Sequence, residues 1–474
     1  MANSDHLAGK LVAGVDSSTQ SVKVVIRHAE TGELIRQGRA PHPDGTEVDP
    51  AHWLSALNTA IAAAGGIDDV SAISIGGQQH GMVTLDASGN VIRPALLWND
   101  TRSATSADDL NTELGGPAKT AEQVGSVLVA AFTAPKLRWV ADNEKENAAK
   151  VAAVALPHDW LSWQMQGGKD FDLLFTDRSD ASGTGYFNPV TSTYRHDILS
   201  SALRTDRAII APRIIEPAAF GGKTLSGIPI AAGAGDNAAA ALGVQAEPGD
   251  VVVSLGTSGT AFAISDTPTH DPSGAVASFA DATGRYLPLV CTLNAARILD
   301  AATRILSKSY EEVGQLALAA TPGAHGLTLL PYFEGERTPN RPNAKGVFAG
   351  MNLTNSNPED IARAMIEGML CGLVDAVDAL VDLGVNVKRV LLIGGAAKNP
   401  AISTIASALF GREVLVPQPG EYVADGAARQ AAWALLGTAT APKWNLGEVH
   451  SALAPATPEV VAQYRSLRDR TQTW

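Results

Sequence analysis

The chain has 474 residues, of which 45% are hydrophobic and 18% charged, which is enough apolar material for the cores of two or three domains. The net charge of −13 argues against sequence-independent binding to nucleic acid, which needs clustered Lys and Arg. No run of about 18 apolar residues predicts a membrane span, and residues 1–10 lack the apolar core of a secretion signal. Cys291 and Cys371 form no metal-binding pattern and predict no disulfide framework. These features predict a cytoplasmic globular protein, most simply an enzyme.

The first half opens with two short apolar strands, residues 11–15 and 22–27, around a turn rich in hydroxyl side chains. Asp49 followed by Pro50 predicts the start of a helix, with Asp49 as N-cap. The other elements predicted in this half are a strand at 70–75 ending in two glycines, a hairpin at 82–93 around the turn 86–90, helices to about residue 165, and a strand at 229–232.

The second half opens in the same way as the first. After the loop 246–250, two apolar strands at 251–255 and 261–264 flank a turn of glycine and hydroxyl residues. The repeat, about half the chain apart, predicts two related halves. Later elements are a helix from Asn357-Pro358 to about 383, a strand at 390–393, a helix from Asn399-Pro400, a strand at 414–416 and a helix at 424–436. Mixed strands and helices in both halves predict a two-domain α/β protein, with domains at 1–245 and 246–474.

The two turns are candidates for binding phosphate. In the first, Ser18 and Thr19 offer hydroxyls beside backbone N–H groups, Lys23 adds positive charge, and Asp16 is suited to holding Mg²⁺. The turn lacks the Walker A pattern, and an ordinary polar hairpin turn is the alternative.

In the second turn, small residues allow a phosphate to approach and hydroxyls can bind it; an ordinary glycine-rich hairpin is again the alternative. The residues concerned are Gly256, Thr257 and Ser258. Two such turns, one from each half, would hold one nucleotide between them.

Asp236 follows an apolar strand and stands at the start of a helix, where a carboxylate can accept a proton from a substrate hydroxyl. Its neighbours Gly233 and Gly235 clear space beside the carboxylate. The alternative is that Asp236 is simply a helix N-cap. A dinucleotide fold is disfavoured because the third glycine of that fingerprint is absent.

Three further stretches combine polar or glycine residues with apolar surroundings. A strand–turn–helix at 392–400 could admit a base or ribose at Gly394, Gly395 and Ala396, unless it is only a tight connection. The stretches 78–82 and 97–102 could face a polyhydroxylated ligand. Their candidate contacts are Gln79, His80, Gly81, Trp98 and Asn99, with core packing of His80 and Trp98 as the alternative.

Taken together, these motifs resemble the FGGY family of carbohydrate kinases over essentially the whole chain. Residues 346–351 and 360–367 fit the family's C-terminal signature, and residues 133–143 resemble its N-terminal signature, with a departure at Ala131. The stretches 79–81, 97–100 and 335–346 are similar to the members that phosphorylate D-xylulose. Gln79 replaces the Met frequent there, and Ser18 replaces a glycine of the first phosphate turn.

The resemblance implies an α/β, actin-like (ribonuclease H-like) ATPase fold, with two related domains around a catalytic cleft. The resemblance also implies roles for single residues. Asp236 matches the catalytic carboxylate, and Asp16 matches a residue linked to Mg²⁺, an ion that Asp236 would share. The matches to phosphate contacts are Thr19, Lys23 and Thr257, those to the adenosine site are Gly395 and Asn399, and those to sugar contacts are Gln79, His80, Asp236 and Asn237.

The expected function is therefore transfer of phosphate from ATP to a small sugar, D-xylulose giving D-xylulose 5-phosphate. Alternatives are a family kinase for ribulose, gluconate, glycerol or fuculose, an actin-like ATP-binding protein without sugar chemistry, and a catalytically silent sugar sensor. No nucleic acid or membrane partner is expected, and a homodimer is left open.

Overall fold

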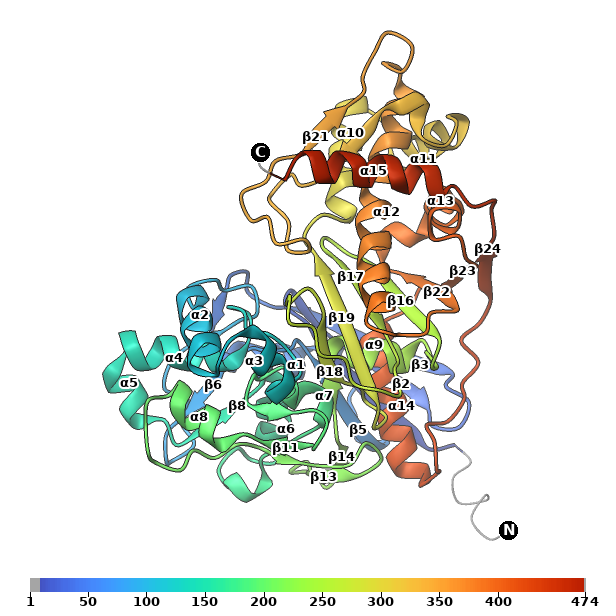
Figure 1. Cartoon of the computed structure of the whole chain (residues 1–474). Helices are drawn as coiled ribbons and strands as arrows, with labels where there is room; N and C mark the ends of the chain where they lie inside the picture. The colour runs from blue at the N-terminus through green and yellow to red at the C-terminus, as the bar shows by residue number, and fades with distance from the viewer. Residues whose placement is uncertain (1–8, 473–474) are drawn as a thin grey trace. The chain divides into compact units, whose positions relative to one another are not determined.

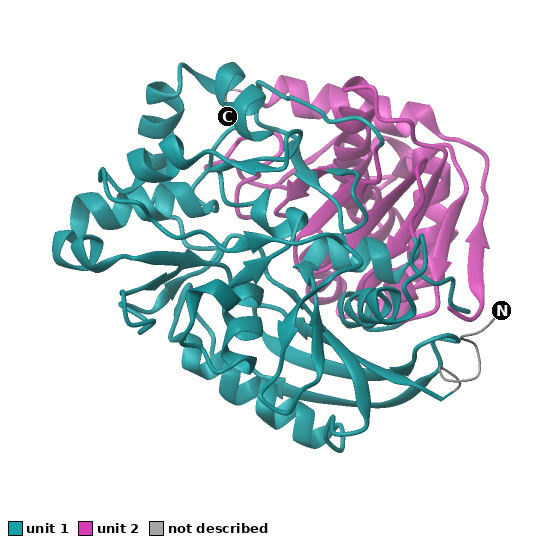
Figure 2. Ribbon diagram, turned by 90° about the horizontal axis from the view of Figure 1, so that it is seen from below, with its two compact units in different colours: residues 1–245, 266–287, 420–445 teal, residues 246–265, 288–419, 446–474 magenta. Residues whose placement is uncertain are grey.

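A computed structural model describes residues 9–472, so most of the polar start of the chain lies outside the described residues. The chain folds into two compact units, coloured separately in Figure 2. Unit 1 consists of residues 1–245, 266–287 and 420–445, and unit 2 of residues 246–265, 288–419 and 446–474.

Unit 1 is built on a mixed sheet in the strand order β13-β14-β5-β1-β2-β3, with β15 also paired to β5. The strand β1 is antiparallel to β2 and parallel to β5, so β1 and β5 end at the same edge of the sheet. The bounds are β1 (Leu11–Ser17), β2 (Ser21–His28), β3 (Leu34–Pro41), β5 (Val70–Gly77), β13 (Phe220–Lys223), β14 (Pro229–Ala231) and β15 (Ala234–Gly235).

Helices cover both faces of this sheet (Figure 1). On one side Trp53 of α1 (Pro50–Ala63) meets Trp160 of α6 (Pro157–Met165) edge to face, 6.3 Å between ring centres, in a core that includes Val15. On the other side lie α9 (Asp236–Gly243) and α14 (Tyr422–Leu436). Because side chains alternate along a strand, Gly14 faces α14, and a Cβ there would lie 2.0 Å from the carbonyl oxygen of Ala424.

Unit 1 contains further elements that are not strands of this sheet. They are β4 (Glu47–Val48), β6 (Val83–Leu85), β7 (Ala95–Leu96), α2 (Ala104–Glu113), α3 (Pro117–Val124), α4 (Thr133–Asn143), α5 (Lys145–Lys150), β8 (Ala153–Ala155), η1 (Phe171–Leu173), β9 (Phe175–Thr176), α7 (Arg178–Ala181), β10 (Phe187–Asn188), β11 (Thr193–Tyr194), α8 (His196–Ala202), β12 (Arg213–Ile214) and β18 (Ala277–Ala280).

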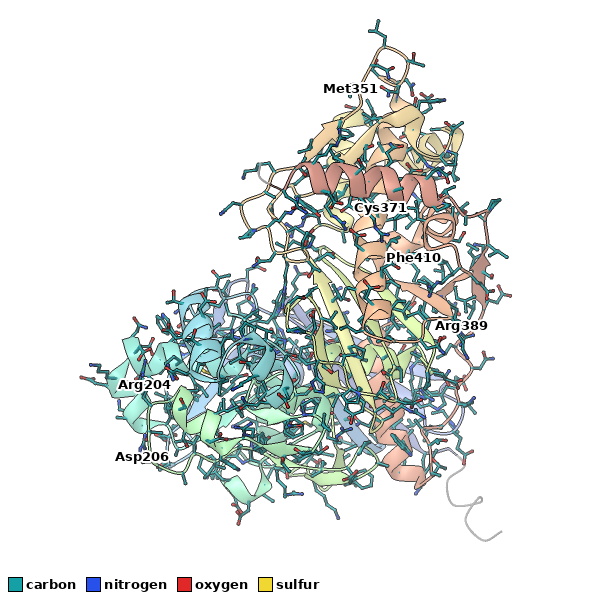
Figure 3. All side chains as sticks on the ribbon, in the orientation of Figure 1. Arg204, Asp206, Met351, Cys371, Arg389 and Phe410 are labelled. Carbon is teal, nitrogen blue, oxygen red and sulfur yellow. The ribbon has the colours of Figure 1, made fainter. Side chains whose placement is uncertain are left out.

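Unit 2 repeats the strand plan of unit 1. Its sheet runs β19-β17-β16-β22-β23-β24, with β16 antiparallel to β17 and parallel to β22. At one end of the central strands, Arg389 (labelled in Figure 3) pairs with Asp250 at 2.5 Å. The bounds are β16 (Asp250–Leu255), β17 (Gly259–Ala263), β19 (Tyr286–Thr292), β22 (Arg389–Ile393), β23 (Val414–Pro417) and β24 (Val449–Ala452).

The helices of unit 2 gather around the long helix α12, which carries Cys371 (Figure 3). Asn357 caps α12 by accepting a hydrogen bond from the Asp360 amide at 2.9 Å. The elements are α10 (Ala296–Leu306), α11 (Tyr310–Ala319), η2 (Ala324–Gly326), β20 (Thr328–Leu330), β21 (Val347–Ala349), α12 (Pro358–Asp382), η3 (Gly395–Lys398), α13 (Pro400–Phe410) and α15 (Pro458–Arg470).

Most of the predicted elements are confirmed. The strand–turn–strand units at the start of both halves form, and the helix starts at Pro50, Pro358 and Pro400 are each capped by the preceding Asp or Asn. The predicted hairpin at 82–93 is confirmed in a short form. The turn 86–90 closes, Leu85 forms an antiparallel bridge with Val91, and the Ile92 amide donates to the Thr84 carbonyl at 3.0 Å. The strand β6 pairs with β8 as well.

The compact units share the predicted division near residue 245 but differ from the sequence-based domains in two later segments. Residues 266–287 and 420–445 pack with unit 1. The second segment contains α14, whose close approach to Gly14 and to α9 accounts for its place in that unit.

No helix in the described part of the chain is long and apolar enough to cross a membrane. Cys291 and Cys371, which are both among the described residues, form no disulfide bond.

Candidate active site

The first phosphate turn joins β1 to β2 and brings charged residues face to face. The strand register places Asp16 opposite Lys23, and the Lys23 Nζ lies 3.3 Å from Asp16 Oδ2. The Ser18 hydroxyl donates to Asp16 Oδ1. Lys23 is also paired with Glu421, at 2.7 Å. Lys23 is therefore held between two carboxylates at the base of the turn.

Burial dominates the electrostatics of this turn. Asp16 is only 2% exposed, and burial raises its pKa although the charge of Lys23 opposes the rise. Burial alone would lower the pKa of Lys23, but the charges of Asp16 and Glu421 outweigh it and raise the pKa. The ammonium therefore stays charged, as a phosphate contact requires.

Asp236 is the first residue of α9, with Gly235 as the N-cap, so the alternative of a simple N-cap aspartate does not hold. Its Oδ1 accepts hydrogen bonds from the backbone N and the side-chain Nδ2 of Asn237, both at 2.8 Å. Asn237 therefore orients the Asp236 carboxylate in addition to any contact it makes with sugar.

Asp16 and Asp236 come to the same edge of the sheet. Gly76 of β5 pairs with Asp16 on one side and with Ala234 on the other, and Asp236 follows Ala234 by two residues. Burial, and then the charge of Asp16, raise the pKa of Asp236 to about 7. Two neighbouring carboxylates, one of which raises the pKa of the other, form a hard oxygen donor set of the kind that suits Mg²⁺.

Gln79 follows β5 and fills the space beside Gly235. Its Nε2 donates to the Ser179 carbonyl at 2.9 Å, and a Cβ at Gly235 would lie 2.6 Å from the Gln79 side chain. The Ser179 hydroxyl in turn accepts a hydrogen bond from the Gly235 amide at 3.0 Å. The glycine before Asp236 thus makes room for Gln79, which refines the expectation that it only clears space beside the carboxylate.

His80 adopts a left-handed backbone conformation, with φ of 68°, which is uncommon for a residue other than glycine. Its carbonyl accepts a hydrogen bond from the buried Lys136 Nζ at 3.0 Å, and its Nδ1 donates to the Gly183 carbonyl at 2.7 Å. The ring also contacts Phe132 and Phe279, at 4.7 and 5.6 Å between centres. The imidazole is therefore fixed in orientation. Gly81 follows, where a Cβ would meet Pro157 at 2.6 Å.

Trp98, a predicted sugar contact, is hydrogen-bonded to the predicted phosphate-binding turn between β1 and β2. The side chain is 38% exposed, so it is not a core tryptophan, and its Nε1 donates to Thr19 Oγ1 at 2.8 Å. Thr19 Oγ1 in turn lies 3.4 Å from Gln78 Oε1. Asn99 points its Nδ2 at the Gly45 carbonyl, 3.4 Å away.

The second turn and the 392–400 turn both belong to unit 2. Thr257 is exposed at the tip of its turn, between Gly256 and Ser258. Gly394 has φ of 99°, and a Cβ there would clash with the Leu255 carbonyl at 2.5 Å, so only glycine allows these two strand ends to meet. A Cβ at Gly395 would meet nothing within 4 Å, so the backbone there is open to a ligand.

Ala396 lies in the short helix η3, and Asn399 begins α13 after it. Asn399 Oδ1 caps α13 by accepting from the Ala401 amide at 3.0 Å, and its Nδ2 donates to the Tyr310 carbonyl at 2.8 Å. Asn399 thus has a clear structural role, and its contact with adenosine stays a prediction.

Comparison with known proteins decides the family. The N-terminal domain model of the FGGY family of carbohydrate kinases matches residues 11–243, and the C-terminal domain model matches residues 251–435. The chain belongs to the FGGY family of carbohydrate kinases. The actin-like two-domain α/β fold implied by the sequence is thereby confirmed.

Relatives of this FGGY kinase cover nearly its full length. A xylulose kinase of Streptomyces coelicolor is 43% identical, over 92% of this chain and 91% of the relative. One from Streptomyces rubiginosus is 42% identical, with the same coverage. The crystal structure of xylulose kinase from Bifidobacterium adolescentis is 48% identical and superimposes with a TM-score of 0.90, covering 97% of this chain and 99% of that one.

Several residues that support the candidate site were not predicted from the sequence of this kinase. Ser179 is hydrogen-bonded to Gln79, and Gly183 and Lys136 are hydrogen-bonded to His80. Glu421 forms an ion pair with Lys23. Lys136 lies in the N-terminal signature, the one available signal. The others lie in irregular segments or on α14, with no motif to mark them.

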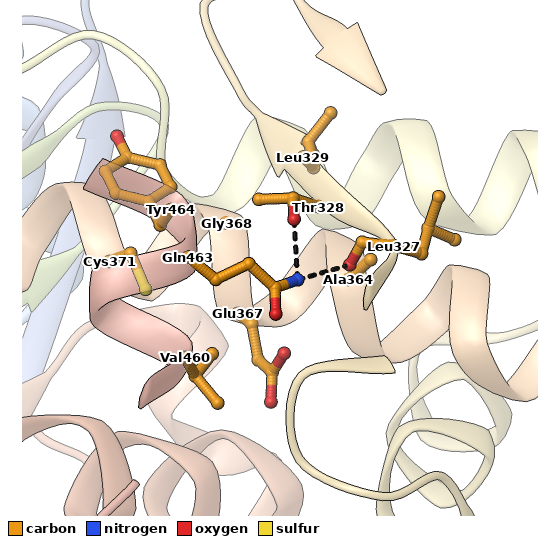
Figure 4. A pocket seen from close by; sticks show the side chains of 10 residues that line it. All are labelled: Leu327, Thr328, Leu329, Ala364, Glu367, Gly368, Cys371, Val460, Gln463 and Tyr464. Carbon is orange, nitrogen blue, oxygen red and sulfur yellow. Dashed lines mark hydrogen bonds between the residues drawn. The ribbon is translucent and has the colours of Figure 1, made fainter. Parts of the chain in front are cut away.

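One small pocket lies away from all of these residues, within unit 2, where Gln463 donates to Thr328 Oγ1 at 2.6 Å (Figure 4). It is lined by Leu327, Thr328, Leu329, Ala364, Glu367, Gly368, Cys371, Val460, Gln463 and Tyr464. It contains no predicted site residue of the kinase.

Proposed function

We propose that this kinase transfers the γ-phosphoryl group of ATP to the terminal hydroxyl of D-xylulose, giving D-xylulose 5-phosphate. The observation that carries the proposal is the pair of carboxylates at one edge of the unit 1 sheet, of which Asp16 is buried and Asp236 half-buried. Asp236, with a pKa raised to about 7, can take a proton from a substrate hydroxyl at neutral pH.

Asp236 is the proposed general base. Asn237 holds one oxygen of its carboxylate by two hydrogen bonds, which fixes the plane of the group. The proton of the attacking hydroxyl passes to Asp236 as the oxygen attacks phosphorus. Phosphoryl transfer depends mainly on positioning and on neutralising charge, so one base with several oriented polar groups is sufficient.

Asp16, with Asp236, would hold the Mg²⁺ that accompanies ATP, and the ion would neutralise charge on the transferred group. Lys23 adds a fixed cation, since its pKa is raised by Asp16 and Glu421. Ser18 and Thr19 offer hydroxyls in the same turn. We expect Thr257 to contact phosphate from unit 2.

In unit 2 we expect Gly394, Gly395 and Ala396 to receive the adenosine, at the turn where the Gly395 backbone is open. That both phosphate turns hold a single nucleotide stays a prediction from the sequence.

Two observations support D-xylulose as the acceptor. The full-length relatives at 42–43% identity, and the solved structure at 48%, are named xylulose kinases. In unit 1, Gln79 and His80 are both fixed by backbone carbonyls beside the sheet edge that carries Asp236, so they present defined hydrogen-bonding groups to a polyol. Such fixed polar groups discriminate between sugars that differ by one hydroxyl.

The test is ADP release with Mg²⁺ and ATP across D-xylulose, D- and L-ribulose, glycerol, gluconate and a control without sugar. Selective turnover with D-xylulose is expected. Turnover with another polyol alone would retain the mechanism but refute the proposed acceptor. ADP release that does not depend on any sugar would refute sugar phosphorylation itself. A cytoplasmic location and a homodimer remain predictions, to be checked by fractionation and by light scattering.

A further inference from the structure

Four ionisable side chains form a buried cluster in unit 1 that the proposed mechanism does not use. The Nε2 of His158 lies 3.4 Å from Asp159 Oδ1, 3.4 Å from Asp177 Oδ1 and 3.2 Å from Asp180 Oδ2. The four side chains are 0–4% exposed. Three carboxylates at this depth, if all were charged and unpaired, would be strongly destabilising, so a cation among them, or protonation of a carboxyl group, has to offset the cost.

His158 supplies that cation. Burial alone would lower its pKa, but the charges of Asp159, Asp180 and Asp177 outweigh burial and raise the pKa to about 10. Burial also raises the pKa of Asp180 well above its usual value, with the charges of Asp159, Asp177 and Asp236 adding to the rise. The cluster is therefore a shared ionic network with an imidazolium at its centre.

The carboxylates of the cluster sit at the starts of two helices. Asp159 accepts a hydrogen bond from the Leu156 amide at 2.8 Å, closing the first turn of α6. Asp177 caps α7, accepting from the amides of Ser179 at 2.7 Å and Asp180 at 3.0 Å. His158, itself on α6, thus ties α6 to α7.

Helix α7 and the turn after it hold the candidate active site directly. The Ser179 carbonyl accepts from Gln79, and the Ser179 hydroxyl accepts from the Gly235 amide, next to Asp236. The Gly183 carbonyl accepts from His80. One short segment therefore contacts both sugar-facing side chains and the backbone that carries the catalytic carboxylate.

His158 also packs directly against the two strand ends that deliver these residues. A Cβ at Gly77, the last residue of β5, would lie 2.9 Å from His158 Cβ. A Cβ at Gly233, between β14 and β15, would lie 2.9 Å from His158 Nδ1. The two glycines leave room for the imidazole behind the strand ends that precede Gln79 and Asp236.

We propose that His158 is a positioning residue for phosphoryl transfer: paired with Asp159, Asp177 and Asp180, it fixes α7 so that Ser179 sets the positions of Gln79 and of the Gly235–Asp236 backbone. The inference rests on the proposed roles of Gln79 and Asp236. It predicts that the positive charge at residue 158 matters for sugar turnover, beyond its contribution to stability.

The same donors could instead bind a metal ion, since ligand atoms of His158, Asp159 and Asp180 lie within 4.8 Å of one another. Elemental analysis of the purified kinase, before and after dialysis against a chelator, separates the two interpretations. The proposal expects no stoichiometric metal in the absence of added Mg²⁺. A tightly held ion whose removal abolishes activity would overturn it.

The kinetic test compares His158→Asn, which removes the cation, with His158→Lys, which restores one. A misplacement of reacting groups by about 1 Å costs on the order of 100-fold in rate, so His158→Asn should lose about that much in kcat/KM for D-xylulose. The KM for ATP should stay within about two-fold, because the adenosine site lies in unit 2. His158→Lys should recover most of the loss.

A charge-balanced double variant adds a test that a purely structural role would not pass. His158→Asn combined with Asp180→Asn leaves fewer uncompensated carboxylates, so it should be more active than His158→Asn alone. Asn111→Ala serves as the matched control. Asn111 is a buried side chain of unit 1, hydrogen-bonded to Leu128, and its loss should lower stability without changing the sugar kinetics.

The outcomes are distinct. Three results would each overturn the proposal. They are unchanged sugar kinetics in folded His158→Asn, a His158→Lys variant that is no more active than His158→Asn, and strictly additive losses in the double variant. If His158→Asn does not fold, Ser179→Ala decides, because it removes the hydroxyl that holds Gly235; wild-type kinetics there would overturn the proposal. A wild-type enzyme that phosphorylates no sugar would refute the proposed function instead.

Discussion

Substituting Gly235 by alanine is a sharp test of how the sugar site is built. The residue has φ of −60° and ψ of 151°, which alanine adopts without strain. The added methyl would lie 2.6 Å from the Gln79 side chain, roughly 0.8 Å short of the 3.4 Å at which ordinary van der Waals contact begins. Gln79 must therefore move by nearly 1 Å, away from its hydrogen bond with the Ser179 carbonyl.

The magnitude follows from that displacement. A shift of about 1 Å in a positioning group costs on the order of 100-fold in rate, so kcat/KM for D-xylulose should fall by about that factor in Gly235→Ala. The KM for ATP should hardly change. The assay is coupled ADP release at varied sugar and then varied ATP. Because the backbone is unstrained, the thermal midpoint should fall only slightly.

The matched control is Gly372→Ala in α12, where the new methyl would make only an ordinary contact of 3.7 Å with Tyr464. This variant should keep wild-type kinetics. Wild-type sugar kinetics in Gly235→Ala would refute the reasoning, because Gln79 would then not need its observed position. An equal loss in kcat/KM for ATP and for sugar would also refute the reasoning.

Three further predictions concern the turn, the base and the core. Trp98→Phe removes the donor to Thr19 and, since one hydrogen bond contributes about 0.5–1.5 kcal/mol, should lower kcat/KM for sugar by about two- to ten-fold; an unchanged value would show that this link is not used. Because the pKa of Asp236 is raised to about 7, its proton-accepting form is lost as the pH falls through that range, so the rate should decline on the acid side of the pH–rate profile. The midpoint of this decline should move to higher pH when the Mg²⁺ concentration is lowered. A profile that is flat from pH 5 to 8 would contradict this. Gly14→Ala places a methyl 2.0 Å from the backbone of α14 and should destabilise the kinase by about 1–3 kcal/mol or more in urea unfolding; a wild-type midpoint would contradict the packing.

Local sequence patterns predicted the framework of each half because each pattern has a direct backbone consequence. Apolar runs at 11–15 and 251–255, each followed by a hydroxyl-rich turn, form the β1–β2 and β16–β17 pairs. The order β3-β2-β1-β5-β14 in unit 1 matches β19-β17-β16-β22-β23 in unit 2, so the predicted relation between the halves holds at the level of topology.

What the sequence did not reveal depends on contacts between distant segments. The pairing of β6 with β8, more than 60 residues further along the chain, was not predicted from the sequence. The return of residues 420–445 to unit 1 depends on glycines that let α14 approach β1 and α9, which no local pattern expresses.

The supporting residues of the candidate site were hidden for a similar reason. Asp177, Ser179 and Asp180 lie in a polar segment without helical or strand periodicity, and their importance comes from partners such as Gln79, 100 positions away. The proposed base Asp236, by contrast, was marked by its place between a strand end and a helix start.

The central claim is that Asp236 is the base of a sugar kinase, and the most direct measurement is kcat for D-xylulose in Asp236→Asn. The matched control is Asp206→Asn, an exposed aspartate in the loop after α8 that is labelled in Figure 3. A general base contributes about 10²- to 10⁴-fold, so Asp236→Asn should lose that much in kcat while staying folded, and the control should be unchanged. A folded Asp236→Asn enzyme with near-normal kcat would contradict the account.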